Sequence, residues 1–285
     1  AIGTGSLALT GGTISSGSNA ARTLLNALTI GGNVTLGNVT NSGTLTLSAD
    51  ANLTGGTYTL TTDSDVTING VVSNGGITKT GASTLSLIGT GANTYTGVTT
   101  INAGTLILNK TGVNAIAGDI TVGDATLVDV LQLGASDQIA DTSVLTLNGT
   151  LPSDRGTFEL RSFNETIGGL SGAGMIQNGS STANSVLTLN VASATTQTSS
   201  AVLRNTGSST TGTLGIAKTG DGTQVLNGIL TYTGTTAVNA GTLVLGQASL
   251  ADTADVSITT GASLDLNYSG ADTIDQLFID GVEQY

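Results

Sequence analysis

The sequence contains no cysteine, no histidine and no tryptophan among its 285 residues. Without cysteine and histidine, the chain can form no disulfide, thiol nucleophile or Ser-His-Asp arrangement, and it lacks the commonest zinc ligands. Catalysis would have to rest on carboxylates, lysine, arginine, tyrosine or serine. The absence of tryptophan also argues against a sugar-binding cleft, because such clefts are rich in aromatic side chains. These absences make an enzyme a weak hypothesis.

Charge is scarce and mostly negative. Only 9% of the residues are charged, and 19 acidic residues against 7 basic ones give a formal net charge of −12. Phosphate backbones would be repelled, so we expect no nucleic-acid partner. No run approaches the roughly 18 apolar residues of a membrane-spanning helix, so we expect no membrane span. The chain begins at Ala1 without signal-peptide features, which predicts a processed product or an excised part of a longer protein.

Proline is nearly absent, whereas glycine is abundant. The chain has 1 proline and 42 glycines, and 38% of its residues are apolar. Disordered chains of low hydrophobicity are usually rich in charge and proline, so we expect a folded protein. Glycine together with threonine, valine, leucine and isoleucine favours many short strands separated by tight turns. The composition therefore predicts an all-β protein.

Short apolar–x–apolar triplets closed by glycine, asparagine or aspartate recur along the chain. Examples are Leu45-Thr-Leu47 and Leu106-Ile-Leu108, in which the alternation places both leucines on one face of a strand. Turn dipeptides such as Asn69-Gly70 and Asn148-Gly149 leave an antiparallel sandwich or barrel open as an alternative. We favour a parallel β-helix, because the strands are too short and too numerous for one sandwich.

Two segments of the chain are copies of one unit. Ile77–Leu108 and Ile216–Leu245 share a lysine, a tyrosine and an Asn-Ala-Gly sequence at corresponding places. Such a repeat is typical of stacked architectures, in which neighbouring units bury a continuous core. The matched pairs are Lys79 with Lys218, Tyr95 with Tyr232, and Gly104 with Gly241.

A coil length of roughly 23 residues predicts one continuous β-helix of about twelve coils over residues 1–285. The motif copies lie near 76–108 and 215–245. The segment between them, near 192–215, is poor in apolar pairs and is expected to be a loop-like insertion. Residues Leu151–Gly156 contain the proline and are expected to form a second loop.

The repeated unit resembles the autotransporter-associated β-strand repeat, also called the passenger-associated transport repeat. The second copy departs from the pattern at Gln224–Gly228, where the first strand lacks its L-x-L, so a register shift or bulge is in question there. The resemblance implies a single-stranded right-handed parallel β-helix, or β-solenoid, secreted to the surface of a Gram-negative-type bacterium. In the first copy the resemblance is carried by Gly76, Lys79, Gly81, Leu85, Leu87, Asn93, Tyr95, Gly97, Thr99, Ile101, Gly104, Thr105, Leu106 and Leu108. In the second it is carried by Gly215, Lys218, Gly220, Tyr232, Gly234, Thr236, Val238, Gly241, Thr242, Leu243 and Leu245.

The repeated polar residues have a structural and a functional interpretation. For Lys79 and Lys218 we favour solvated residues at a coil edge over a ladder of docking charges. For Tyr95 and Tyr232 we favour the cover of an apolar corner over an adhesive stripe. Threonine triplets such as Thr57-Tyr-Thr59 show no regular coil-to-coil spacing in the sequence, so we do not predict a flat threonine array of the ice-binding type.

Closely spaced carboxylates are the remaining candidates for chemistry. Asp63 with Asp65 and Asp252 with Asp255 come nearest to the acidic sets of polysaccharide-active β-helix enzymes, but solvated corner residues are the preferred interpretation. The double glycines lack the aspartate of calcium-binding nonapeptide repeats. We therefore predict no enzyme and assign no catalytic, cofactor-binding or metal-ligating residue and no cofactor.

Three hypotheses of function follow, in order of preference. The first is a structural unit of an extracellular bacterial filament, sheath or surface layer. It assembles through its ends, because we find no capping helix at Ala1–Gly12 and no polar cap after Ile279. Its partner would be a second copy, head to tail, or a flanking β-helix of the same chain. The second is an adhesin-type passenger that binds a surface glycan or protein. The third is a polysaccharide-active enzyme.

Overall fold

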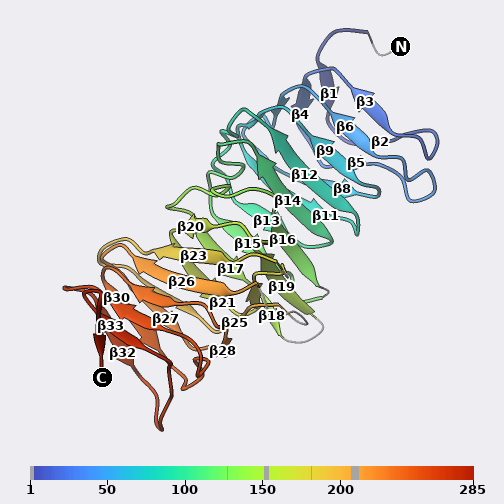
Figure 1. Ribbon diagram of the computed structural model, residues 1–285. Coiled ribbons are helices and arrows are strands. Elements are labelled where there is room, and N and C mark those ends of the chain that lie inside the picture. Colours follow the sequence, from blue (N-terminus) through green and yellow to red (C-terminus); the bar gives the residue numbers. More distant parts are fainter. Residues whose placement is uncertain (1–2, 127, 151–153, 181, 207–211) are drawn as a thin grey trace.

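The computed structural model describes residues 3–126, 128–150, 154–180, 182–206 and 212–285. Within these ranges the chain forms strands and turns and no helix. Successive strands climb as an elongated stack, with the two ends of the chain at opposite ends of the rod (Figure 1). The chain is a parallel β-solenoid of about twelve turns, which confirms the predicted fold class and coil number. Whether all 285 residues form one continuous β-helix stays a prediction.

The first face of the solenoid is a 12-stranded sheet that runs nearly the whole length of the rod. Its neighbours are parallel and come from successive coils, as stacking requires. In order, its strands are β2 (Thr13–Ile14), β5 (Val34–Leu36), β8 (Thr57–Thr62), β11 (Gly76–Thr80), β13 (Thr99–Ile101), β15 (Ile120–Val122), β17 (Val144–Leu147), β21 (Gly169–Gly172), β24 (Thr196–Ser199), β27 (Thr223–Leu226), β30 (Thr242–Leu245) and β32 (Ser263–Leu266).

The second face is an 11-stranded sheet. One member, β18 (Gly149–Thr150), lies off the main path and pairs antiparallel with β19 (Asp154–Glu159). The other strands are β3 (Arg22–Leu24), β6 (Leu45–Leu47), β9 (Val66–Ile68), β12 (Thr84–Gly89), β14 (Thr105–Lys110), β16 (Asp129–Leu133), β22 (Met175–Gln177), β25 (Val202–Arg204) and β28 (Leu230–Thr231).

The third face is interrupted. A 4-stranded sheet covers its first coils and a 7-stranded sheet its last ones. Three coils pass between them without a strand, linked by one isolated bridge between Ile116 and Ile139. The first sheet contains β1 (Leu7–Leu9), β4 (Leu28–Ile30), β7 (Ala51–Asn52) and β10 (Val72–Ser73). The second contains β20 (Glu165–Ile167), β23 (Ser185–Asn190), β26 (Leu214–Thr219), β29 (Thr236–Val238), β31 (Val256–Ile258), β33 (Leu277–Ile279) and β34 (Val282–Gln284).

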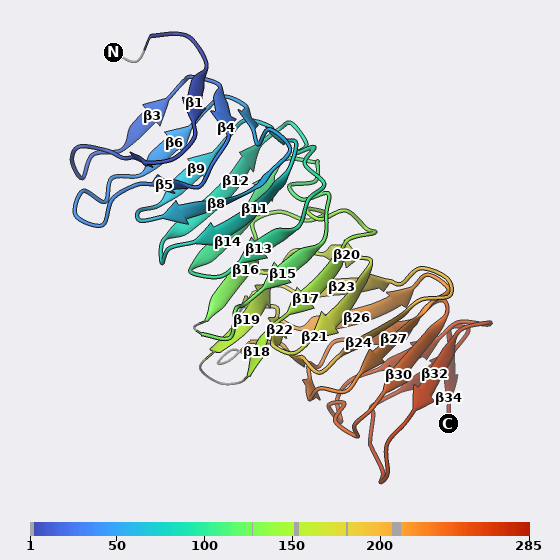
Figure 2. The same cartoon turned by 180° about the vertical axis from the view of Figure 1, so that it is seen from behind.

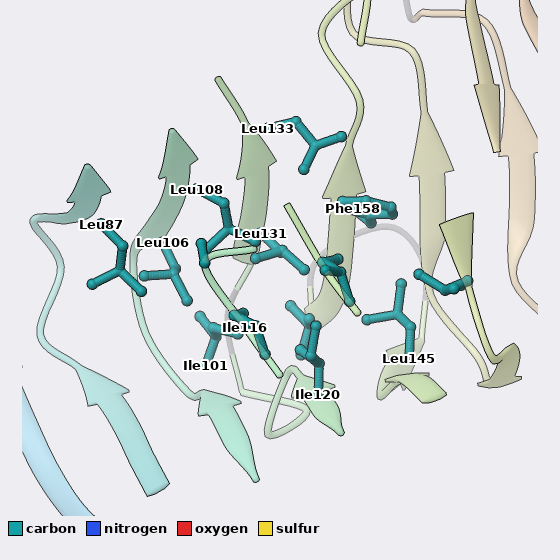
Figure 3. Packing of buried hydrophobic residues seen from close by; sticks show 14 of the residues in the cluster. Leu87, Ile101, Leu106, Leu108, Ile116, Ile120, Leu131, Leu133, Leu145 and Phe158 are labelled. Atoms are coloured by element: carbon teal, nitrogen blue, oxygen red, sulfur yellow. The ribbon is translucent and has the colours of Figure 1, made fainter. Parts of the chain in front are cut away.

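The core is a column of apolar side chains inside the three faces. Leu85, Leu106 and Leu131 are directly opposed on neighbouring second-face strands, and all three are fully buried. Figure 3 shows Leu106 and Leu131 side by side, with Ile101 and Ile120 pointing inward from the first face. Each such side chain stabilises the fold by about 1.5–3 kcal/mol through burial. The apolar–x–apolar triplets therefore specify the core, as the alternation predicts.

Two predicted loops need correction. Near 192–215 we expected a loop-like insertion, but β24 and β25 in this segment are regular rungs of the first and second faces; residues 207–211 lie outside the described part. In the expected loop Leu151–Gly156, the segment from Asp154 to Gly156 begins β19, and residues 151–153 are not described. In both places the strand hydrogen bonds come from adjacent coils, so they form without a strong local apolar pattern.

The structure also answers two smaller questions, about the register at Gln224 and about a cap after Ile279. At Gln224 the register is unbroken, because Gln224 faces Leu243 just as Leu85 faces Leu106. After Ile279 we expected no cap, but β34 folds back antiparallel onto β33 and covers its edge. The turn at Asp280-Gly281, with both residues at positive φ, makes this hairpin possible.

Candidate functional site

All three lysines of this acidic chain are buried inside the solenoid. Lys79, Lys110 and Lys218 have no exposed surface. The prediction that Lys79 and Lys218 are solvated residues at a coil edge is therefore wrong. A buried ammonium needs polar partners to offset its lost hydration, and backbone carbonyls at the corners provide them.

Lys79 closes the corner that follows β11. Its Nζ donates hydrogen bonds to the carbonyl oxygens of Thr80 at 3.0 Å, Gly81 at 2.8 Å and Ala103 at 2.8 Å. Thr80 and Gly81 belong to its own corner, whereas Ala103 belongs to the next coil. The backbone oxygen of Lys79 also accepts the N–H of Asn102 at 2.9 Å. One side chain thus joins two consecutive coils.

Lys218 repeats this arrangement in the second motif copy. Its Nζ donates to the carbonyl oxygens of Thr219 at 2.7 Å, Gly220 at 2.7 Å and Ala240 at 3.1 Å. Its backbone oxygen accepts the N–H of Asn239 at 2.9 Å. We call each set of one lysine and its three carbonyl acceptors a lysine corner.

Glycine is required where the coils approach each other at a lysine corner. Gly81 and Gly104 both have positive φ, at 80° and 70°. A Cβ on Gly104 would lie 2.6 Å from the carbonyl oxygen of Gly81, closer than such atoms can come. The glycines of the motif therefore permit the turn that aims the carbonyls at the ammonium.

The Lys79 corner contains a carboxylate as well. Burial lowers the pKa of Lys79 to about 8, against the opposing effect of Asp129 and Asp65. Burial raises the pKa of Asp129 to about 6, although the backbone N–H of Asp124 and the charge of Lys79 favour its ionised form. Neither carboxyl oxygen of Asp129 makes a hydrogen bond of ordinary geometry to a described residue. The sequence offered no signal for this group, because Asp129 lies outside the matched motif positions.

The repeated tyrosines are core residues. Tyr95 and Tyr232 are fully buried, and their hydroxyl groups lie 2.9 Å from Thr99 Oγ1 and 2.6 Å from Thr236 Oγ1. Burial raises the pKa of Tyr95 to about 12 and raises that of Tyr232 as well. The interpretation of these residues as cover for the core is confirmed, and an adhesive tyrosine stripe is not formed by them.

The carboxylate pairs singled out in the sequence are not brought together. Asp63 and Asp65 adjoin β9, whereas Asp252 and Asp255 precede β31 near the far end of the rod. Asp65 Oδ1 accepts the N–H of Thr84 in the next coil at 3.0 Å, so it serves a corner. Asp50 and Asp119 accept backbone N–H groups of the following coil in the same way. In this solenoid, corner carboxylates hold adjacent coils together.

A regular threonine column lies on the outside of the first face, which corrects the expectation of irregular spacing. The coils differ in length, but the strand register aligns six hydroxyl side chains on consecutive coils. Beyond Thr80 the backbone hydrogen bonds continue the stack through Asn102, Gly123 and Asn148, so the hydroxyl column is one residue wide there. The six residues are Thr59, Thr78, Thr100, Thr121, Thr146 and Ser171.

The outer second face carries a charged cluster that the sequence did not reveal. Arg204 donates two hydrogen bonds to Gln177 Oε1, and Gln177 Nε2 donates to Glu159 Oε1 at 2.6 Å. Arg161 Nη1 lies 3.8 Å from Glu159 Oε2. These side chains come together because Glu159, Gln177 and Arg204 are opposed in register on successive coils. Their mutual pairing stabilises the stack and leaves no isolated acid–base set among them.

A shallow groove lies on the outer side of the third face, over β23, β26 and β29. Its volume is 240 Å³, and its lining includes Val186, Gly215, Ala217, Thr235 and Ala237. It exists because the outward positions Gly215 and Ala217 of β26 and Ala237 of β29 carry side chains no larger than methyl. The lining offers hydroxyl, amide and apolar groups but no ionisable side chain.

The described residues contain no group of three or more acidic side chains placed to hold a metal ion. They also contain no helix that is long and apolar enough to cross a membrane.

Comparison with known proteins identifies the repeat. The family model of the passenger-associated-transport-repeat matches residues 77–108, 103–128 and 216–245. The first and third matches coincide with the two copies recognised in the sequence, and the second extends the first copy by one further coil. No curated protein and no solved structure matches the chain.

Proposed function

We propose that this chain is a structural, non-catalytic rod outside the cell, of the autotransporter passenger type. The passenger-associated-transport repeats and the parallel β-solenoid support this proposal. In this proposal the rod is a component of a filament, sheath or surface layer of a Gram-negative-type bacterium. The repeat itself suggests a secreted or surface-exposed protein.

The observation that carries the proposal is the use of the repeated polar side chains. In both copies the lysine, the tyrosine and its threonine partner are buried and engaged within the solenoid. What the motif repeats is therefore a set of internal contacts that stack one coil on the next. A repeat selected for chemistry or binding would instead keep a reactive or recognising group on the outside.

Assembly would use the exposed strand edges of the described rod. At β32 the apolar side chain of Leu266 is 54% exposed, and it lies with Leu264 and Tyr268 around an apolar hollow of 250 Å³. Unpaired strand edges beside apolar side chains template pairing with further strands. Those strands can come from further coils of the same polypeptide or from a second copy, and the filament proposal takes the second copy.

Electron microscopy of the native surface material and of this purified chain tests the proposal. We expect fibres or sheets with an axial repeat set by the solenoid. Leu266→Lys at the β32 edge should reduce assembly, because it places a charge against the incoming strand. Val186→Lys, on the flank of β23 and also partly exposed, is the matched control and should assemble normally. Monomers of the native chain at high concentration, without axial order, would contradict the filament.

A second candidate is an adhesin-type rod, and the third-face groove favours it. The groove could receive a neutral chain such as a glycan or an extended peptide, since it presents hydroxyl and amide groups beside small apolar ones. A glycan array and a host-protein screen with the purified chain test this function. Binding should be lost in Ala217→Gln, which fills the groove, and kept in Thr146→Gln on the first face. Equal binding by both variants would rule out the groove.

A further inference from the structure

The interruption of the third face lies near the middle of the rod. On this face strand pairing stops at β10 and resumes at β20. Figure 2 shows β20 about halfway along the molecule. In the three intervening coils, segments 93–95, 114–116 and 137–139 cross this face. Backbone contacts remain, such as the N–H of Ala115 to the oxygen of Gln138 at 2.7 Å. The regular ladder of the other two faces is absent.

Buried polar side chains replace the missing ladder. Asn93 Oδ1 accepts the N–H of Val72 at 2.8 Å, and its Nδ2 donates to the oxygen of Ala115 at 2.8 Å. Gln138 Oε1 accepts the N–H of Lys110 at 2.6 Å, and its Nε2 donates to the oxygen of Lys110 at 3.0 Å. An amide suits this task because it carries both a donor and an acceptor. Neither residue changes its charge with pH.

The last member of this series is a carboxyl group. Glu165 Oε2 accepts the N–H of Gln138 at 2.8 Å, and Oε1 accepts the N–H groups of Ile139 at 3.2 Å and Thr166 at 3.3 Å. Glu165 is 1% exposed. It thus joins the segment 137–139 to β20, where the sheet resumes.

Apart from the three N–H donors, the surroundings of Glu165 oppose its charge. Beyond the effect of burial, Asp137, on the segment that Glu165 clamps, is a like charge that raises the pKa of Glu165 further. The backbone of Lys110 is bonded to Gln138, but its ammonium donates to the oxygens of Ile88 and Gly70 in earlier coils and not to Glu165. On β23, the residue opposite Glu165 is the apolar Leu187. Burial is the main cause that raises the pKa of Glu165 to about 8, while its three N–H donors act in the opposite direction.

We propose that Glu165 makes the interruption of the third face a proton-sensitive joint, which is tight when the carboxyl group is protonated and opens more readily when it is charged. In the closed joint, a protonated carboxyl keeps two N–H bonds on its carbonyl oxygen. A charged carboxylate gains free energy by reaching water, and it does so when the segment 137–139 moves off β20. The rod therefore flexes at this place as the pH rises.

The direction of this pH effect follows from the linkage between proton binding and opening of the joint. The closed joint holds its proton up to about pH 8, whereas an opened, hydrated glutamate has an ordinary pKa near 4.5. The proton-linked stabilisation of the closed joint is complete below about pH 4.5. It is lost as the pH rises through the interval up to about pH 8. Opening is thus rarest in acid and most frequent in mild alkali.

Amide hydrogen exchange of the whole chain from pH 5 to pH 9, corrected for intrinsic exchange, tests the joint. We expect protection of the Gln138, Ile139 and Thr166 amides to fall by at least about tenfold across this range. The Leu170 amide is a control within the same molecule. It donates to Oε1 of the buried Gln224, which does not titrate, and its protection should stay constant.

Two variants sharpen the test. Glu165→Gln should remove the pH dependence at Gln138 and Ile139, and Gln224→Glu should introduce one at Leu170. Constant protection at Gln138 and Ile139 in the unmodified chain, protection that rises with pH, or an unchanged slope in Glu165→Gln would each overturn the proposal. If a variant fails to fold, the comparison of Ile139 with Leu170 in the unmodified chain still decides it.

Discussion

The two lysine corners are the same structure on different faces of the solenoid. Lys79 lies on β11 of the first face, whereas Lys218 lies on β26 of the third face. Accordingly Tyr95 crosses the third face, and Tyr232 follows β28 of the second. The second copy is thus rotated by one face relative to the first. The motif therefore specifies a corner and the coil that follows it, wherever in the turn that corner falls.

The two corners differ in charge. Above the first corner, β16 begins at the buried Asp129, and the N–H of the next residue, Val130, bonds to the oxygen of Gly104. Above the second corner, the N–H of Ser263 bonds to the oxygen of Gly241, and the preceding residue is Ala262. The carbonyl acceptors are thus common to both corners, while the buried carboxylate belongs to the first alone.

Replacing the lysines gives the largest expected effect. Lys79→Met should lower the free energy of unfolding by about 3–5 kcal/mol, because it leaves three corner carbonyls and Asp129 without their cation. Lys218→Met should cost less, about 2–3 kcal/mol, since only carbonyls lose their partner. Guanidinium unfolding at pH 7 measures both, with the outward Thr78→Val as control. Equal losses in the two variants would show that Asp129 contributes nothing to the difference.

Replacing Gln224 in the second copy by the leucine that the first copy has at this position should have an intermediate effect on stability. Gln224 Oε1 accepts the N–H of Leu170 at 3.0 Å, and its Nε2 donates to the oxygen of Leu170 at 2.9 Å. Gln224→Leu restores the motif of the first copy, yet it should destabilise the fold by about 1–3 kcal/mol, because both backbone groups lose their partner. A stability gain, measured by the same unfolding curves, would mean that the motif outweighs these bonds.

The pH dependence of Asp129 should be smaller. Because its pKa is raised from 3.8 to about 6, its proton stabilises the fold fully below about pH 4. That stabilisation is lost as the pH rises through 6. Between pH 4 and pH 7 the unmodified chain should therefore lose on the order of 1 kcal/mol relative to Asp129→Asn. Parallel unfolding curves of the two proteins at every pH would contradict a titrating Asp129.

The tyrosine pair should give the smallest effect and the closest agreement between copies. Tyr95→Phe and Tyr232→Phe each remove one buried hydroxyl bond, and each should cost about 1 kcal/mol. Adding Thr99→Val to the first variant and Thr236→Val to the second should recover part of the loss, because both partners are then apolar. A loss confined to one copy, in thermal unfolding of the four variants, would show that the tyrosine does not play an equivalent part in the two copies.

The sequence predicted the architecture because its signals are local. Alternating pairs such as Leu106 and Leu108 mark inward positions, and the motif glycines mark corners, so coil number and core follow from counting. The polar residues were harder to predict. Lys79 was expected in water, because a lysine in a short, threonine-rich segment looks exposed until the carbonyls of two coils surround it.

The register between strands of consecutive coils could not be predicted from the sequence either. The coils vary in length, so Thr100 and Thr121 become neighbours only through the strand pairing of consecutive coils. The same holds for Glu159, Gln177 and Arg204, and for the contact of Gln224 with Leu170, which are 54 positions apart. Nothing in the spacing of these residues predicts that they meet.

By itself, the amino-acid sequence determined an all-β stacked fold, its repeat and the inward-facing apolar residues, because strand alternation and glycine corners depend on neighbours along the chain. Only the tertiary structure decided where the charges lie. The three lysines and Glu165 are inside, since carbonyl or N–H groups from separate coils converge on them, and Asp129 is buried beside the corner of Lys79. A buried charge is tolerated where several coils together solvate it, and that convergence exists only once the coils are stacked.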